Sequence, residues 1–120
     1  MTHVVFYKSG NTFWGFDVDG HSDFADAGED IVCSAISSMT MLVVNAVEET
    51  YKSIINYEVD EENAVVRVEA LGALPEHEPD EKKRYAISGL FKAYYRQLKL
   101  LEEEFPENLR VLVIKRKPTV

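Results

Sequence analysis

The sequence has almost no cysteine. Cys33 is the only one among 120 residues, so no disulfide can form within the chain. A chain without disulfides is typical of a reducing compartment, and we therefore expect a cytoplasmic protein. The first residues also lack the basic segment and the long apolar core of a signal peptide, which argues against secretion.

Long apolar runs and an excess of positive charge are missing as well. No unbroken run of about 18 apolar residues occurs, and we therefore expect no contact with a membrane. The net charge is −8, with 21 acidic and 13 basic residues. An acidic surface repels phosphate backbones, so we expect no direct binding of nucleic acid. On charge alone, plain solubility is the simplest interpretation, and a basic partner is the alternative.

Alternating apolar residues near the start predict a β-hairpin. The segments THVVFYK and TFWGFDVDG are rich in β-branched and aromatic residues, and Gly10 and Asn11 between them suit a tight turn. In the second segment Trp14, Phe16 and Val18 alternate with polar residues. We expect these three side chains to share one face of the sheet.

Two longer segments have the spacing of helices. The first is predicted to begin at the N-cap residue Asp30, which places Cys33 in its first turn. The second is predicted to begin after the N-cap residue Asp80 and to stop before Pro106. Their apolar stripes are Val32, Ile36, Met39, Val43 and Val47 in the first helix and Ile87, Leu90, Phe91, Tyr94, Leu98 and Leu101 in the second.

The remaining segments complete an order of seven elements. SIINYEV and AVVRVEAL are predicted strands on either side of the acidic turn DEEN, and NLRVLVIKRK is a predicted last strand. The order ββαββαβ, with no repeat and no internal boundary, predicts a single α+β domain over residues 1–120. We expect a mainly antiparallel sheet packed against two helices.

The segment between His21 and Cys33 is the most informative part of the sequence. A helix N-terminus and a nearby imidazolium both favour the thiolate, which is the nucleophile of cysteine enzymes. The acidic side chains of the intervening loop, Ser22–Glu29, oppose a thiolate unless they point away from it. The small residues of this loop predict that it is mobile. Residue types alone leave open a packing cysteine and a solvated histidine.

The segment GHSDFADAGEDIVCSAIS resembles the active-site segment of the ribosomal-processing cysteine protease family, Prp. The family pattern is Gly-His, a short loop with a glycine, Asp-Ile-Val-Cys, small residues and a serine. The matching positions are Gly20, His21, Gly28, Asp30, Ile31, Val32, Cys33, Ala35 and Ser37. The length, the element order and the acidic end of the second helix are also similar. Ser22 and Ser34 depart from the residues that usually follow the histidine and the cysteine.

This resemblance implies a cysteine endopeptidase that removes the N-terminal extension of a large-subunit ribosomal protein. It implies Cys33 as the nucleophile, His21 as base and acid, and Ser37 as an assisting residue. Gly20 and Asp30 are further candidates for substrate binding or oxyanion support. The resemblance also implies a basic ribosomal protein as substrate and a homodimer.

Other interpretations stay open. Zinc would need about four well-placed ligands, and the candidates are scattered: His3, His21, His77 and Cys33. We therefore expect neither a metal nor another cofactor. The main alternative function is a non-enzymatic, ribosome-associated interaction module of the same fold. In such a module Tyr94 and Tyr95 would contact a partner, although core and dimer packing is the interpretation we favour for both.

Overall fold

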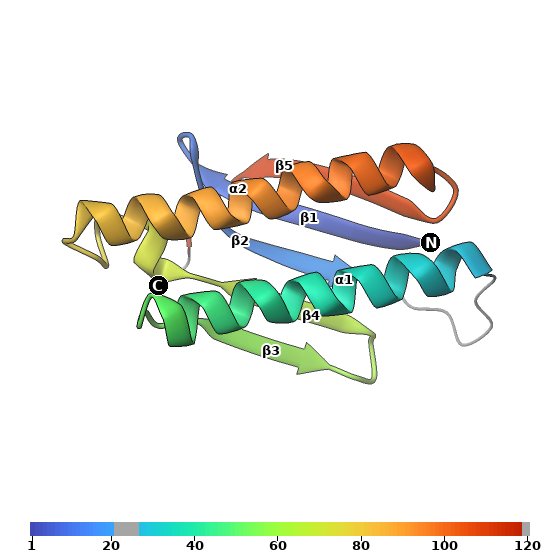
Figure 1. The fold of residues 1–120 in the computed structure, drawn as a ribbon, viewed down its shortest axis with the longest axis horizontal. Coiled ribbons are helices and arrows are strands. Elements are labelled where there is room, and N and C mark those ends of the chain that lie inside the picture. The colour runs from blue at the N-terminus through green and yellow to red at the C-terminus, as the bar shows by residue number, and fades with distance from the viewer. Residues whose placement is uncertain (21–26, 119–120) are drawn as a thin grey trace.

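A five-stranded sheet forms one layer of the molecule. The computed structural model describes residues 1–20 and 27–118 (Figure 1). Their strands are β1 (Thr2–Ser9), β2 (Thr12–Asp19), β3 (Asn56–Asp60), β4 (Val65–Glu69) and β5 (Leu109–Lys115). The strand order is β3-β4-β2-β1-β5, in which β1 and β5 are parallel and the other pairs are antiparallel. The predicted α+β class and the mainly antiparallel sheet are confirmed.

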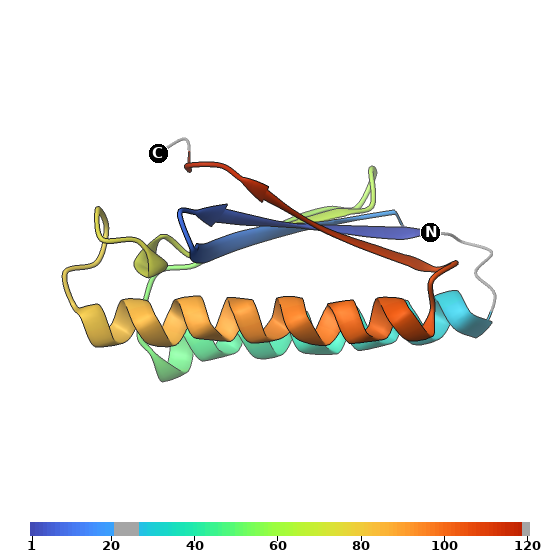
Figure 2. The ribbon, with the colours of Figure 1, turned by 90° about the horizontal axis from the view of Figure 1, so that it is seen from above.

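Both helices lie on the same face of the sheet (Figure 2). They are α1 (Ala27–Asn45), which continues into the π-helical turn η1 (Ala46–Thr50), and α2 (Glu81–Glu104). A short 3₁₀ turn, η2 (Leu71–Ala73), leads from β4 toward α2. Apolar side chains between the two layers form one core, which includes Val4, Phe6, Phe16, Val32, Ile36, Val43, Val68, Ile87, Phe91 and Leu98. Figure 1 shows α1 beside β3 and β4, so a helix and the sheet edge flank the space described below.

The second helix begins and ends where the sequence predicts. The Asp80 carboxylate accepts hydrogen bonds from the backbone N–H groups of Lys82 and Lys83, at 2.9 and 3.4 Å. This N-cap satisfies two N–H groups that have no partner inside the helix. The helix ends at Glu104, two residues before Pro106, and the chain then turns directly into β5.

The first helix begins three residues earlier than predicted. It starts at Ala27, so Asp30 lies inside its first turn and Cys33 lies in its second turn. The predicted N-cap role of Asp30 is therefore wrong, and so is the predicted loop over residues 27–29. The sequence misled because a Gly-Glu-Asp run suits a loop, whereas acidic residues are also favourable in the first turn of a helix.

A β-bulge corrects the predicted face of Trp14. The pairing of β1 with β2 shifts after Tyr7, so β2 carries one extra residue there. Phe16 packs against Phe91 of α2, whereas Trp14 stacks on Tyr7, with ring centroids 5.5 Å apart. Trp14 therefore does not share the helix-facing side with Phe16 and Val18. Strict alternation fails at a bulge, which residue types alone do not reveal.

The first helix has an unusually apolar composition. Ala27–Thr50 is long and apolar enough to cross a membrane by length and composition, with a mean hydropathy of 1.6 in its most apolar window. Counting unbroken apolar runs does not find this segment, because small polar residues interrupt them. Val32, Ile36 and Val43 of this helix are buried against the sheet. A helix that supplies the core of a two-layer domain has the same composition, so the composition alone does not identify a membrane span.

Candidate active site

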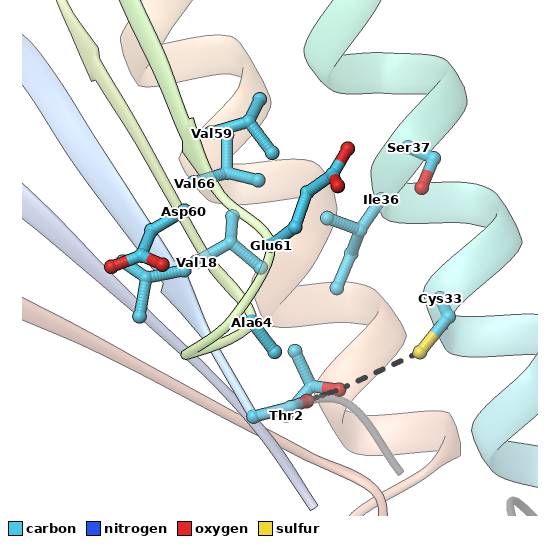
Figure 3. A pocket seen from close by; sticks show the side chains of 12 residues that line it. Thr2, Val18, Cys33, Ile36, Ser37, Val59, Asp60, Glu61, Ala64 and Val66 are labelled. Carbon is cyan, nitrogen blue, oxygen red and sulfur yellow. Dashed lines mark hydrogen bonds between the residues drawn. The ribbon is translucent and has the colours of Figure 1, made fainter. Parts of the chain in front are cut away.

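Cys33 lines a groove between α1 and the β3–β4 hairpin. The groove has a volume of about 320 Å³, and its walls are mostly apolar. Figure 3 shows Ile36 on the helix and Val18, Val59 and Val66 on the strands around this space. The Cys33 side chain is half-buried, so its sulfur is accessible from the groove. A groove with this lining favours apolar groups of a ligand.

Ser37 joins Cys33 on the same side of α1. The two residues are four positions apart, which places them one above the other on one face of a helix. Both line the groove, and Figure 3 shows their side chains on neighbouring turns. The structure therefore brings together the predicted nucleophile and the predicted assisting serine.

Gly20 directly follows β2 and lines the groove. It adopts φ of +96°, and a Cβ atom added there would overlap the carbonyl oxygen of Met1. A side chain at this position would therefore push the start of β1 away. Gly20 lines the groove together with Cys33, and its predicted role in substrate binding or oxyanion support stays a prediction.

The turn between β3 and β4 gives the groove an acidic rim. Asp60 and Glu61 both line the groove where β3 turns toward β4; in Figure 3 the Glu61 side chain extends toward α1, whereas the Asp60 carboxylate points away from it. Asp60 accepts hydrogen bonds from the Asn63 side-chain amide at 2.8 Å and from the Asn63 backbone N–H at 3.1 Å. These bonds hold the pKa of the exposed Asp60 carboxyl below its ordinary value, because they favour the charged form. The rim is negatively charged at neutral pH and would attract a basic peptide.

Two polar side chains lie against the Cys33 sulfur. The Thr2 hydroxyl oxygen is 3.8 Å from Sγ, and Oε1 of Glu29 is 3.9 Å from it (Figure 3 shows the Thr2 contact). Glu29 is only 4% exposed, and its Oε1 accepts a hydrogen bond of 2.7 Å from the Thr2 hydroxyl. Its Oε2 accepts a hydrogen bond of 3.3 Å from the side chain of Asn108. A buried carboxylate thus belongs to the immediate surroundings of the thiol.

Two of the predicted site residues are not part of the group around Cys33 in the described structure. Asp30 is exposed and lies with Ile31 and Ser34 in a shallow hollow on another side of α1, outside the groove lining. His21 lies outside the described residues, and so does the part of the predicted mobile loop from residue 22 to residue 26. Within residues 1–20 and 27–118, no three His, Cys, Asp or Glu side chains gather closely enough to hold a metal ion.

Sequence reasoning missed Thr2 and the role of Glu29. Glu29 had a usable signal, since it precedes Cys33 by four residues and a helix places such residues side by side. Thr2 had none, because only the packing of α1 against the start of β1 brings it to the sulfur. The hairpin residues of the groove wall, such as Val59, were predicted as strand but not as part of the site.

Tyr94 belongs to the core and is not an exposed partner contact. It is 4% exposed, donates a hydrogen bond to the carbonyl oxygen of Ile36 at 3.2 Å and lies 2.9 Å from the Thr40 hydroxyl. Burial raises the pKa of Tyr94 to about 12. Tyr95 is half-buried and packs against Phe13. Both tyrosines therefore pack within the chain, as the core part of the favoured interpretation predicts, and dimer packing stays a prediction.

Comparison with known proteins gives the same family as the sequence resemblance. The family model described as cysteine protease Prp matches residues 1–110. No protein with a curated description matches the chain.

Solved structures match over almost the whole chain. SMU.848 from Streptococcus mutans is 25% identical, with a TM-score of 0.78, and the match covers 97% of this chain and 99% of that one. The ribosomal processing protease Prp from S. aureus, in complex with a substrate peptide, is 19% identical, with a TM-score of 0.77. That match covers 95% of this chain and 100% of the other. The likeness to the S. aureus protein concerns the fold. Because the family model matches over residues 1–110, the chain belongs to the Prp family of cysteine proteases.

Proposed function

We propose that the chain is a cysteine endopeptidase that removes the N-terminal extension of a large-subunit ribosomal protein in the cytoplasm. The observation that carries this proposal is the position of Cys33, whose thiol lines an apolar groove of about 320 Å³ with an acidic rim. The S. aureus relative has been solved with a substrate peptide and also with a covalently linked product peptide, and it is a ribosomal processing protease.

The groove suits an extension that contains apolar side chains followed by basic ones. Val59 and Val66 would contact the apolar part, since burial of apolar surface is favourable at roughly 25 cal/mol per Å². Asp60 and Glu61 would attract the basic part of a ribosomal protein. The acidic net charge of the chain would then serve substrate capture in addition to solubility.

Cys33 and His21 would carry out the reaction as a dyad. The Cys33 sulfur attacks the scissile carbonyl carbon, and the thiol proton passes to His21. His21 then protonates the leaving amine as the C–N bond breaks, which leaves a thioester on Cys33. Water, deprotonated by His21, hydrolyses the thioester and regenerates the thiol. Gly20 immediately precedes His21 in the sequence and lines the groove. This position of Gly20 supports the proposed dyad.

The other predicted residues would support this reaction from different places. Ser37 is exposed and faces the groove, where its hydroxyl would donate to the developing oxyanion. Gly20 would allow the substrate backbone to approach closely. Asp30 lies outside the groove lining, so we assign it to a part of the substrate that extends past the start of α1.

The decisive assay incubates the purified chain with a ribosomal protein that carries an N-terminal extension and follows the mass of the product. Cys33→Ser should keep the fold, because the change in volume is small, and should nearly abolish cleavage, because a hydroxyl is a far poorer nucleophile. Cys33→Ala should still bind the extension peptide. A Cys33→Ala variant that cleaves as fast as the parent would refute the protease and leave the interaction module as the function.

We also propose that the chain forms a homodimer. Apolar side chains on the outer side of α1 support this proposal, since Ile31 is 52% and Leu42 is 63% exposed. Light scattering on the purified chain measures the mass directly. Leu42→Glu should shift the mass toward the monomer, and a monomeric parent protein would contradict the proposal.

A further inference from the structure

The surroundings of the Cys33 sulfur contain a negative charge that the proposed chemistry does not require. Glu29 is almost fully buried and precedes Cys33 by one helical turn. Its Oε1 is 3.9 Å from Sγ and 2.7 Å from the Thr2 hydroxyl, and the same hydroxyl is 3.8 Å from Sγ. The three groups form a closed triangle on one side of the groove.

Three elements fix this triangle in place. Glu29 belongs to α1, Thr2 begins β1, and Asn108, which donates to the second Glu29 oxygen, precedes β5. The Thr2 hydroxyl also donates, at 3.0 Å, to the carbonyl oxygen of Gly20, which directly follows β2. Buried carboxylates persist where hydrogen bonds offset their desolvation. The carboxylate therefore has a defined position against the sulfur rather than a mobile one.

The Thr2 hydroxyl has a single proton, and the acceptor of this proton depends on whether Cys33 is a thiol or a thiolate. While Cys33 is a thiol, the Thr2 hydroxyl can donate to Glu29 at 2.7 Å or to the Gly20 carbonyl oxygen at 3.0 Å, and the thiol donates to Oε1 of Glu29 at 3.9 Å. When Cys33 becomes a thiolate, it needs donors, and a carboxylate offers none. Of the two groups, only Thr2 can then turn its proton toward the sulfur.

The charge of Glu29 acts in the opposite direction. Two negative charges about 4 Å apart repel each other by about 1 kcal/mol in water and by more inside a protein. Among the described residues, the other charged groups around this position are the amino group of Met1, 3.9 Å from Glu29, and the rim carboxylates of Asp60 and Glu61. Figure 3 shows Asp60 and Glu61 on the hairpin wall of the groove, across from the helix that carries Cys33.

We propose that Glu29 and Thr2 together set the reactivity of Cys33. The Glu29 carboxylate restrains ionisation of the thiol and holds the Thr2 side chain against the sulfur. The Thr2 hydroxyl stabilises the thiolate once it forms. Glu29 is thus a positioning residue for the Thr2 side chain, and the Met1 ammonium, 3.9 Å away, offsets part of its charge. This inference rests on the proposed function only in treating Cys33 as the nucleophile.

The test measures alkylation of Cys33 by iodoacetamide at one fixed pH, followed by the mass of the protein. Because the chain has one cysteine, the mass shift reports this thiol alone. Glu29→Gln keeps the shape and removes the charge, so alkylation should become about fivefold faster or more. Thr2→Val removes the donor to the thiolate and should slow alkylation about tenfold. Thr2→Ser should restore the parent rate.

Glu48→Gln is the matched control, because it makes the same chemical change at an exposed position of η1 and should leave the rate unchanged. A merely structural role would move the rates of Glu29→Gln and Thr2→Val in the same direction. The proposal is overturned if Glu29→Gln reacts no faster than Glu48→Gln, or if Thr2→Val and Thr2→Ser react alike. Should Glu29→Gln not fold, the Thr2 pair decides the outcome.

The same variants separate this inference from the proposed function. Alkylation needs no substrate and no peptidase activity. Suppose that Cys33→Ala loses cleavage and Thr2→Val keeps the parent alkylation rate. The proposed protease function would then stand, and the proposed role of Glu29 and Thr2 would be refuted. Suppose instead that the alkylation rate rises in Glu29→Gln and falls in Thr2→Val, but no extended ribosomal protein is cleaved. The role of Glu29 and Thr2 would then stand, and the proposed substrate would be refuted.

Discussion

Gly20 is the residue at which the site tolerates no side chain. Its φ of +96° strains any L-residue, and its Cβ would overlap the Met1 carbonyl oxygen. We expect Gly20→Ala to lower the free energy of unfolding by about 2–3 kcal/mol, because strain and a backbone clash add. Urea unfolding measures the loss. Cleavage should fall as well, since the start of β1 carries Thr2.

Gly10→Ala provides the comparison for this prediction. Gly10 also has positive φ, at +61°, but a Cβ there would meet nothing within 4 Å. Its cost should be about 1–2 kcal/mol, from conformational strain alone. Equal losses of stability in the two variants would mean that the contact of Gly20 with the start of β1 contributes nothing.

Tyr94 shows how one buried hydroxyl joins the two helices. It donates to the Ile36 carbonyl of α1 at 3.2 Å and lies 2.9 Å from the Thr40 hydroxyl. Tyr94→Phe should lower the free energy of unfolding by about 1–2 kcal/mol, because a buried hydroxyl loses its partner. Tyr85→Phe, at an 83% exposed position, should stay within about 0.5 kcal/mol of the parent. Thermal or urea unfolding of both variants checks this.

At the scale of elements, Glu102 joins α2 to β5. One of its oxygens accepts the backbone N–H of Val111 at 2.6 Å, and the other accepts the Lys99 ammonium at 2.7 Å. Partial burial raises the pKa of Glu102, but these two hydrogen bonds outweigh it and leave the pKa below its ordinary value. The pKa of Lys99 is raised, mainly by its hydrogen bond to Glu102.

The lowered pKa of Glu102 sets the direction of a pH effect. A carboxyl whose pKa is depressed by folding stabilises the fold above its unfolded pKa of about 4.3, and this contribution disappears as the pH falls through the folded value. Glu102→Gln should therefore cost about 1 kcal/mol near pH 7, because a neutral amide oxygen accepts the Val111 N–H more weakly than a carboxylate does, while exposed ion pairs contribute little. The difference from the parent should vanish in acid.

Urea unfolding at several pH values measures the effect of Glu102→Gln. Glu103→Gln is the matched control, because Glu103 is exposed on the same turn of α2 and should show no such dependence. A cost of Glu102→Gln that stays constant down to about pH 3, below the unfolded pKa, would contradict the assignment.

The elements themselves were predictable from local patterns, and their exact packing was not. Asp80 and Pro106 mark the ends of α2 by local chemistry, so both were found from the sequence. The face of Trp14 was not, because the bulge after Tyr7 depends on pairing between strands. The start of α1 was misplaced because Gly28 and the acids around it suit a loop as well as a first helical turn.

The candidate site was predictable only as far as it lies on one helix. Cys33 and Ser37 are four residues apart, so their common side follows from helical geometry. Thr2 reaches the sulfur from β1 by tertiary packing, which no local pattern encodes. The groove wall has the same origin, since β3 and β4 face α1 only in the folded sheet.

At the scale of the whole molecule, the net charge conceals an uneven distribution. Ten of the 13 Lys and Arg residues follow residue 81, and 17 of the 21 Asp and Glu residues precede residue 82. Figure 1 places α2 and β5, the two elements after residue 81, on the side of the sheet away from β3 and β4. The acidic part of the chain, before residue 82, thus includes the hairpin wall of the groove. The basic part, in α2 and β5, lies on the side of the sheet away from the groove.

This polarity predicts that capture of a basic peptide depends on salt. The Debye length falls from about 30 Å at 0.01 M salt to about 8 Å at 0.15 M, so distant acidic residues lose their influence while the apolar contacts in the groove remain. For a peptide with Lys and Arg after the scissile bond, kcat/KM should fall about tenfold over this range. The same peptide with Gln at those positions should show almost no change.

The rim of the groove should account for part of this salt dependence. Asp60→Asn combined with Glu61→Gln removes two charges that line the groove, and should reduce the salt effect for the basic peptide without altering cleavage of the neutral one. Glu48→Gln combined with Glu49→Gln removes two exposed charges from η1, which does not line the groove, and serves as the control. Equal salt dependence for the basic and the neutral peptide would show that apolar contacts alone select the substrate, and that the acidic half of the chain serves only to keep the protein in solution.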